Sequence, residues 1–142
     1  MAELVAITAG ILSKKWSVGL LIGYVLIILG ETVIFRTPGG SYHYKLQLFW
    51  SYTIWERAQA EILANIYVYI PLGLIAGNLW KWKGILIGLG FSLSIELLQL
   101  ITRRGWFEFD DLIHNTLGTL IGVAIYIIIM KLIKKEISDT RR

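Results

Sequence analysis

The sequence predicts an all-α integral membrane protein, built as a bundle of four transmembrane helices. Hydrophobic residues make up 56% of the chain and charged residues only 17%, whereas about a quarter of the residues in a soluble domain are charged. The mean hydropathy is +0.63. Four apolar runs approach or exceed the roughly 20 residues that a helix needs to cross a bilayer. They cover residues 16–35, 62–80, 84–101 and 112–133.

The 142 residues fit one domain, residues 1–142, without room for a separate soluble enzyme domain. The first dozen residues are apolar but short, with Leu4, Ile7 and Ile11 on one helical face, so we expect a short interfacial helix there. The run at 16–35 lacks a preceding basic segment and a following small-x-small cleavage site. We therefore interpret it as an uncleaved signal anchor.

The link between the first two runs, residues 36–61, is rich in aromatic residues. Aromatic rings prefer the headgroup level of a membrane, so part of this link is expected along the interface. Residues 46–60 could form a helix that runs into the second span. The short Trp80-Lys-Trp-Lys83 link makes the second and third helices antiparallel neighbours.

Glycines recur with the small-xxx-small spacing that lets helix backbones approach closely. The pairs are Gly19/Gly23, Gly73/Gly77, Gly84/Gly88 and Gly118/Gly122. This spacing favours close packing of the spans.

The distribution of Lys and Arg predicts that both ends of the chain are cytoplasmic. With that orientation nine basic residues lie inside and five outside, which accounts for all 14. The inner set is Lys14, Lys15, Lys81, Lys83, Lys131, Lys134, Lys135, Arg141 and Arg142. Because these residues flank apolar runs and form no separate basic face, the net charge of +4 does not indicate nucleic-acid binding. The chain has no cysteine, which excludes disulfides and thiolate-ligated metals.

Polar residues within the apolar runs share helical faces. The third run carries Ser92, Glu96, Gln99 and Arg103 on one face. The fourth run carries Asp111, Asn115, Gly118 and Gly122 on one face, with His114 at its edge. The second run carries Glu61, Asn65 and Tyr69. In the predicted topology they gather toward the outer end of the bundle, which indicates an outward-facing polar pocket. A structural network that fixes helix register is the alternative interpretation, although intramembrane ionisable residues are functional candidates by default.

Two groups of segments resemble the VanZ-like membrane protein family. The first is NIYVYIPLG at residues 65–73; the second is SIELLQ at 94–99, RGWFEFDD at 104–111 and NTLG at 115–118, followed by Gly122. Tyr69, His114 and Glu31 depart from the family pattern. The resemblance implies a multi-pass protein of the bacterial cytoplasmic membrane, and a link to low-level teicoplanin resistance, but no reaction.

The preferred function is a non-enzymatic protein whose pocket engages a membrane lipid or lipid-linked envelope molecule, without cofactor or metal. The expected ligand contacts are Arg36, Asn65, Glu96, Gln99, Arg104, Asp110, Asp111 and Asn115. Arginines suit phosphate or carboxylate groups, which they can grip bidentately. One alternative is an intramembrane enzyme acting on an envelope lipid through Glu96 and Asp111, with or without a metal held also by Asp110 and His114. A second is a structural subunit of an envelope complex.

Overall fold

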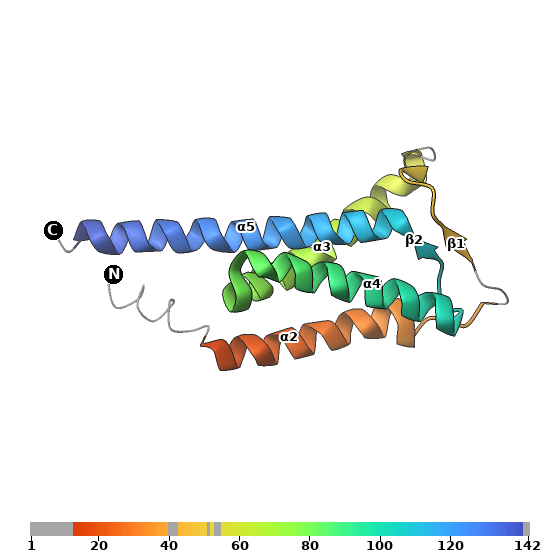
Figure 1. Ribbon diagram of the computed structural model, residues 1–142, viewed down its shortest axis with the longest axis horizontal. Helices are drawn as coiled ribbons and strands as arrows, with labels where there is room; N and C mark the ends of the chain where they lie inside the picture. Colours follow the sequence, from red (N-terminus) through yellow and green to blue (C-terminus); the bar gives the residue numbers. More distant parts are fainter. Residues whose placement is uncertain (1–12, 40–42, 51, 53–54, 141–142) are drawn as a thin grey trace.

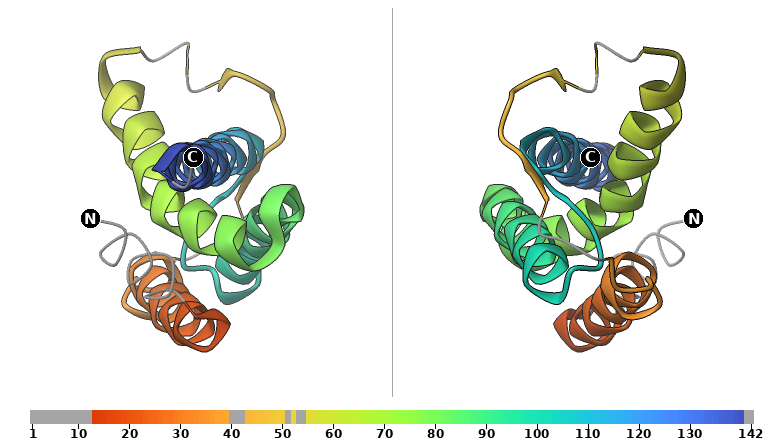
Figure 2. Two further views of the ribbon diagram at one scale, coloured as in Figure 1. Left: turned by 90° about the vertical axis from the view of Figure 1, so that its left-hand side faces the viewer. Right: turned by 90° about the vertical axis from the view of Figure 1, so that its right-hand side faces the viewer.

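The computed structural model describes residues 13–39, 43–50, 52 and 55–140, and in this part of the chain four long helices lie side by side (Figure 1). Helix α2 (Lys14–Leu29) continues into the π-helical turn η1 (Gly30–Ile34). Helix α3 (Trp55–Trp80) is joined to α4 (Gly84–Thr102) by the 3-10 turn η3 (Lys81–Lys83). Helix α5 (Phe109–Thr140) completes the bundle. Viewed along its length, α3 lies between α2 and α5 (Figure 2).

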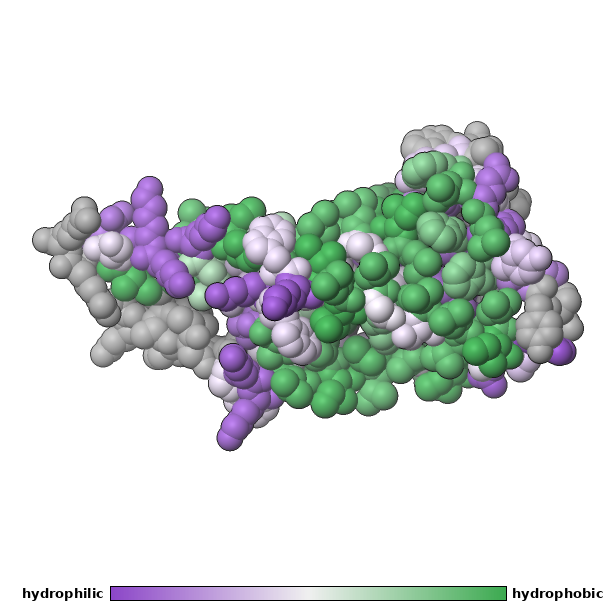
Figure 3. Space-filling model, in the orientation of Figure 1, coloured by the Kyte–Doolittle hydropathy of each residue, from purple (hydrophilic) through white to green (hydrophobic). Residues whose placement is uncertain are grey.

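Three stretches of the described chain are long and apolar enough to cross a membrane: Lys14–Ile34, Gln59–Thr102 and Phe109–Thr140. The second stretch is 44 residues long and holds most of α3 and all of α4, with a reversal of the chain at η3. The face seen in Figure 3 has a broad apolar band with hydrophilic residues at both ends of the long axis. A membrane protein with an all-α fold is therefore supported, while the four-span count stays a prediction.

The helix boundaries extend beyond the predicted apolar runs. Helix α3 begins at Trp55 and α5 runs from Phe109 to Thr140, because polar residues at the ends of a span still favour helix once the apolar segment has nucleated it. The predicted helix over residues 46–60 is found from Trp55 onward, whereas residues 46–49 are not helical. The predicted interfacial helix in the first dozen residues lies outside the described part.

A short parallel strand pair, not foreseen in the all-α prediction, joins the two links at one end of the bundle. Strand β1 (Tyr44–Lys45) pairs with β2 (Phe107–Glu108). The N–H of Phe107 donates to the carbonyl of His43 over 3.1 Å. Backbone groups of a loop need partners wherever they are shielded from water, and this pairing gives the two links partners in each other.

Both turns that flank α4 use a basic residue in the left-handed backbone conformation. Lys81 has φ 54° and Arg103, the C-cap of α4, has φ 56°. Glycine is the usual residue for this conformation because it has no Cβ. Each turn thus places a cationic side chain where the chain reverses direction.

Helices α3 and α5 have the most extensive contact of the described helices, and glycines allow their backbones to approach closely. A Cβ added at Gly73 would overlap the carbonyl oxygen of Thr119, and one at Gly122 would overlap the carbonyl oxygen of Ile70. Gly118 faces the carbonyl of Ile66 in the same way. The glycine-spacing prediction is correct for this pair. It is wrong for Gly19/Gly23, because nothing in the described chain lies within 4 Å of a Cβ built at either position.

A polar network also ties the helices together at the η3 end, opposite the end where the sequence places the shared polar faces. The amide of Asn78 donates to the hydroxyl of Ser17 over 2.6 Å. The hydroxyl of Tyr126 donates to the side-chain oxygen Oδ1 of Asn78 over 2.9 Å. This chain of contacts connects α2, α3 and α5.

Candidate functional site

A polar cavity of about 570 Å³ lies at the strand-pair end of the bundle. Side chains from α3, α4, α5 and the two links form its wall. The lining residues are Arg36, Lys45, Trp50, Glu61, Ala64, Asn65, Gln99, Gly105, Trp106, Glu108 and Asp111. The cavity is within the usual size range of small-molecule sites.

Four of the predicted contact residues line this cavity: Arg36, Asn65, Gln99 and Asp111. The amide of Asn65 donates to Oδ1 of Asp111 over 2.8 Å, which joins α3 to α5 at the cavity wall. The amide of Gln99 donates to the carbonyl of Thr32 over 3.1 Å. The helical spacing read from the sequence therefore brought these side chains from three helices and the first link to one place.

The other four predicted residues lie outside the cavity lining and bind backbone or buried polar groups. Glu96, only 2% exposed, accepts a hydrogen bond from the N–H of Glu108 over 2.9 Å. Asp110 accepts one from the N–H of Phe49 over 2.6 Å. Arg104 donates to the carbonyl of Val33 over 3.2 Å and also to that of Ile34. These three side chains hold the links against the helix ends.

Asn115 belongs to a buried network beneath the cavity. Its amide nitrogen donates to the hydroxyl of Ser92 over 2.9 Å, which joins α5 to α4. Within α5, the hydroxyl of Thr119 donates to the backbone carbonyl of Asn115 over 3.0 Å. A network of this kind fixes the register of two helices, as the structural interpretation of the polar faces expects.

The residues considered for a metal site do not come together as ligands. Among the described residues, no group of three or more Asp, Glu or His side chains lies close enough to share a metal ion. His114 instead lies 3.1 Å from the Tyr52 hydroxyl, measured from its Nε2. The metal-dependent form of the enzyme hypothesis therefore has no support from this geometry.

Sequence reasoning missed the cationic and aromatic wall of the cavity. The ammonium of Lys45 lies 3.0 Å from the ring centroid of Trp50 and 4.4 Å from that of Trp106. A cation placed over the face of a Trp ring is attracted by the ring quadrupole. The aromatic-rich link was visible in the sequence, but its contact with Trp106 depends on the pairing of β1 with β2.

The cavity carries both signs of charge. Arg36 and Lys45 supply cations, while Glu61, Glu108 and Asp111 supply carboxyl groups. Burial raises the pKa of Glu108 above its usual value, and the nearby Lys45 opposes that rise. Such a wall can bind an anionic group, hydroxyl groups and an amine of one ligand at the same time.

Comparison with known proteins gives a family match over most of the chain. The sequence model of the VanZ/LLP1 family matches residues 20–130. The chain belongs to this family. Among curated proteins it is similar to Protein VanZ of Enterococcus faecium, with 33% identity over 70 residues, which cover 46% of this chain and 44% of that protein. The aligned part thus spans less than half of the relative, and no solved structure matches.

The VanZ/LLP1 match includes every residue that lines the polar cavity. It ends at residue 130, so the last ten described residues of α5, with several lysines, lie beyond it. The cavity is thus part of the family region, whereas the basic end of α5 is outside that region.

Proposed function

We propose that this VanZ/LLP1 protein is a non-enzymatic membrane protein that binds the headgroup of a lipid or lipid-linked molecule in its polar cavity. It has four spans, both chain ends are cytoplasmic, and the cavity faces the outside. The observation that carries the proposal is the mixed-charge cavity of about 570 Å³ at the end of an apolar bundle. Intramembrane and juxtamembrane charges placed around one cavity are costly unless they serve a ligand or each other.

The surroundings of the cavity favour an amphipathic ligand. Large apolar side chains close in sequence to lining residues are exposed, among them Phe35 at 75% and Ile101 at 68%. A headgroup in the cavity could therefore leave its acyl chain along the apolar helix surface. Each methylene that stays in the bilayer adds roughly 0.8 kcal/mol to membrane residence.

The two sides of the wall suggest how the headgroup is held. The Arg36 guanidinium suits a phosphate or carboxylate, which it can bind with two parallel hydrogen bonds. Asp111, oriented by the Asn65 amide, and Glu61 face the same cavity and can accept hydrogen bonds from hydroxyl or amine groups. In a host exposed to glycopeptides, such binding would lower the access of an acylated antibiotic to its target.

Retained lipid tests the proposal directly. Native mass spectrometry of detergent-extracted protein should show a bound lipid that Asp111→Asn and Arg36→Ala lose. Asp139→Asn is the matched control, because Asp139 is an exposed carboxylate at the other end of the same helix. Equal lipid retention by Asp111→Asn, Arg36→Ala and the control would exclude the cavity as the binding site.

Drug susceptibility gives a second readout. Expression in a susceptible host should raise tolerance to teicoplanin, which carries an acyl chain, more than to vancomycin, which does not. Asp111→Asn should abolish the difference while the protein remains in the membrane. Equal protection against both drugs would show that the acyl chain is not sensed, and turnover of an added lipid would favour an enzyme instead.

A further inference from the structure

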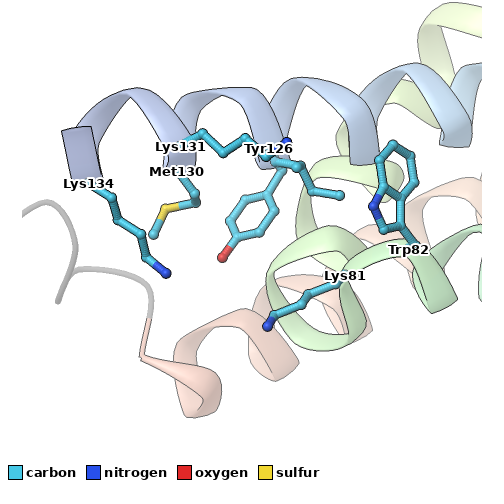
Figure 4. A pocket seen from close by; sticks show the side chains of 7 residues that line it. Lys81, Trp82, Tyr126, Met130, Lys131 and Lys134 are labelled. Atoms are coloured by element: carbon cyan, nitrogen blue, oxygen red, sulfur yellow. The ribbon is translucent and has the colours of Figure 1, made fainter.

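A second concave surface lies at the opposite end of the bundle, where α5 passes η3. It is a groove of about 250 Å³, and Figure 4 shows the side chains around it. The lining residues are Lys81, Trp82, Tyr126, Ile127, Met130, Lys131 and Lys134. We name this surface the lysine groove.

The charge of the lysine groove has one sign. Three of its seven lining residues are lysines, and none of the lining residues in the described chain is acidic. The lysines come from two elements, Lys81 from η3 and the other two from α5. The ammonium ends of Lys81 and Lys134 extend toward the same gap below Tyr126 (Figure 4). A single helix with a basic stripe would not produce this concave arrangement.

Two features hold the lysine groove in shape. Lys81 is fixed in the left-handed conformation by the tight turn between α3 and α4. Tyr126 is held by its hydrogen bond to Asn78, which in turn binds Ser17. The base of the groove is thus held in shape by contacts that leave the ammonium groups of its lysines available.

The rest of the groove wall is mainly apolar, and the surface beside it has exposed apolar side chains that acyl chains could contact. Ile127 and Met130 line the groove itself. On the same helix, Ile128 is 56% exposed and Leu132 62% exposed, and Trp82 of η3 is 55% exposed. Tryptophan at this level is typical of the membrane–water interface. A ligand with an anionic head and apolar tails matches both parts of this surface.

We propose that the lysine groove binds the phosphate of an anionic glycerophospholipid, in the leaflet at the η3 end of the bundle. Basic pockets between helices are a known form of lipid-headgroup recognition. Lys81 and Lys134 contact the phosphate as point charges, Lys131 adds to the positive charge, Tyr126 contributes the polarised edge of its ring, and the acyl chains lie against α5. This site is separate from the polar cavity and does not depend on the function proposed for that cavity.

The test is titration of phosphatidylglycerol into the detergent-solubilised full chain, followed by native mass spectrometry. Replacing Lys81, Lys131 and Lys134 together by Gln should weaken binding at least about tenfold, since these are the lysines that line the groove and attract the anionic headgroup there. The matched control replaces Lys14, Lys15 and Lys135 by Gln, which removes the same charge from the same end outside the groove. Binding to the control should change less than twofold.

Met130→Trp adds a second arm that leaves every charge in place. The indole should fill the groove and reduce phosphatidylglycerol binding, with the thermal unfolding midpoint checked for each variant. Equal loss in the two triple variants would overturn the proposal, because binding would then follow total charge at that end. Displacement of the lipid by equimolar inorganic phosphate would also overturn it, since a soluble anion would then be the ligand. Phosphatidylcholine should not compete.

Discussion

The two ends of the bundle differ in how they combine charge with shape. The strand-pair end has a polar cavity in which cations and carboxyl groups face each other, and two tryptophans enclose the Lys45 ammonium. The η3 end has a smaller groove, in which all the charged lining residues are lysines. Mixed charge can select among headgroups by their donors and acceptors, whereas charge of one sign selects only for an anion. In the proposed functions, the strand-pair end therefore selects the headgroup, and the η3 end binds anionic lipid without further selection.

The largest expected effect is a difference in cysteine labelling that shows which end of the bundle faces the outside of the cell. Because the chain has no cysteine, Tyr44→Cys and Trp82→Cys report the two ends separately, and both positions are exposed. An impermeant maleimide applied to intact cells should label Tyr44→Cys and leave Trp82→Cys unlabelled. Lysis should then expose both cysteines to the reagent. Labelling of only Trp82→Cys in intact cells would invert the bundle and place the cavity inside.

A second experiment asks whether the ends share one framework. Gly122→Val should drive a side chain into the backbone of α3 at Ile70 and destabilise the helix pair. Overpacking typically costs about 1–3 kcal/mol, and a clash with backbone belongs at the upper limit. Ligand binding at both ends should fall together with the unfolding temperature. Gly19→Val, with open space around it, is the control and should leave both unchanged.

A third substitution should affect only the cavity end. Glu96→Ala leaves the part-buried N–H of Glu108 without its acceptor, which should cost about 1 kcal/mol, at the lower end of the penalty for an unsatisfied donor. Hydrogen exchange should rise at residues 105–109 but not around η3. Glu96→Gln keeps an acceptor oxygen and should lose much less. If Ala and Gln lose the same stability, the charge of Glu96 matters more than its hydrogen bond to β2.

The smallest effect is a pH dependence of the cavity end. Burial raises the pKa of Glu108 above the value of 4.5 expected for an unfolded chain, so the folded state binds this proton more tightly. Its contribution to stability is therefore greatest at acid pH and is lost as the pH rises from about 4.5 through the folded pKa. Glu108→Gln should flatten this part of the stability curve in thermal unfolding from pH 4 to 8. If stability depends more steeply on pH in Glu108→Gln than in the parent protein, the Glu108 carboxyl is not the cause of this part of the curve.

The helices and part of the cavity could be predicted from the sequence because they follow from local periodicity. The positions of Asn65, Gln99 and Asp111 on their helices were enough to bring them together. Lys45 and Trp106 could not be placed, because their contact depends on two links more than 60 residues apart meeting as strands. The backbone partners of Glu96 and Arg104 could not be predicted for the same reason, because the path of a link produces no periodic pattern in the sequence.

The left-handed residues at the two turns have a practical consequence for protein engineering. Lys81 and Arg103 occupy a conformation that is strained for any residue with a Cβ, by roughly 1–2 kcal/mol. Both turns therefore combine a less favourable backbone conformation with a cationic side chain. For crystallisation, Arg103→Gly is the first substitution to try, because it relaxes this turn and Arg103 lines neither site. The equivalent change at Lys81 would remove part of the lysine groove, so that turn is best left as it is.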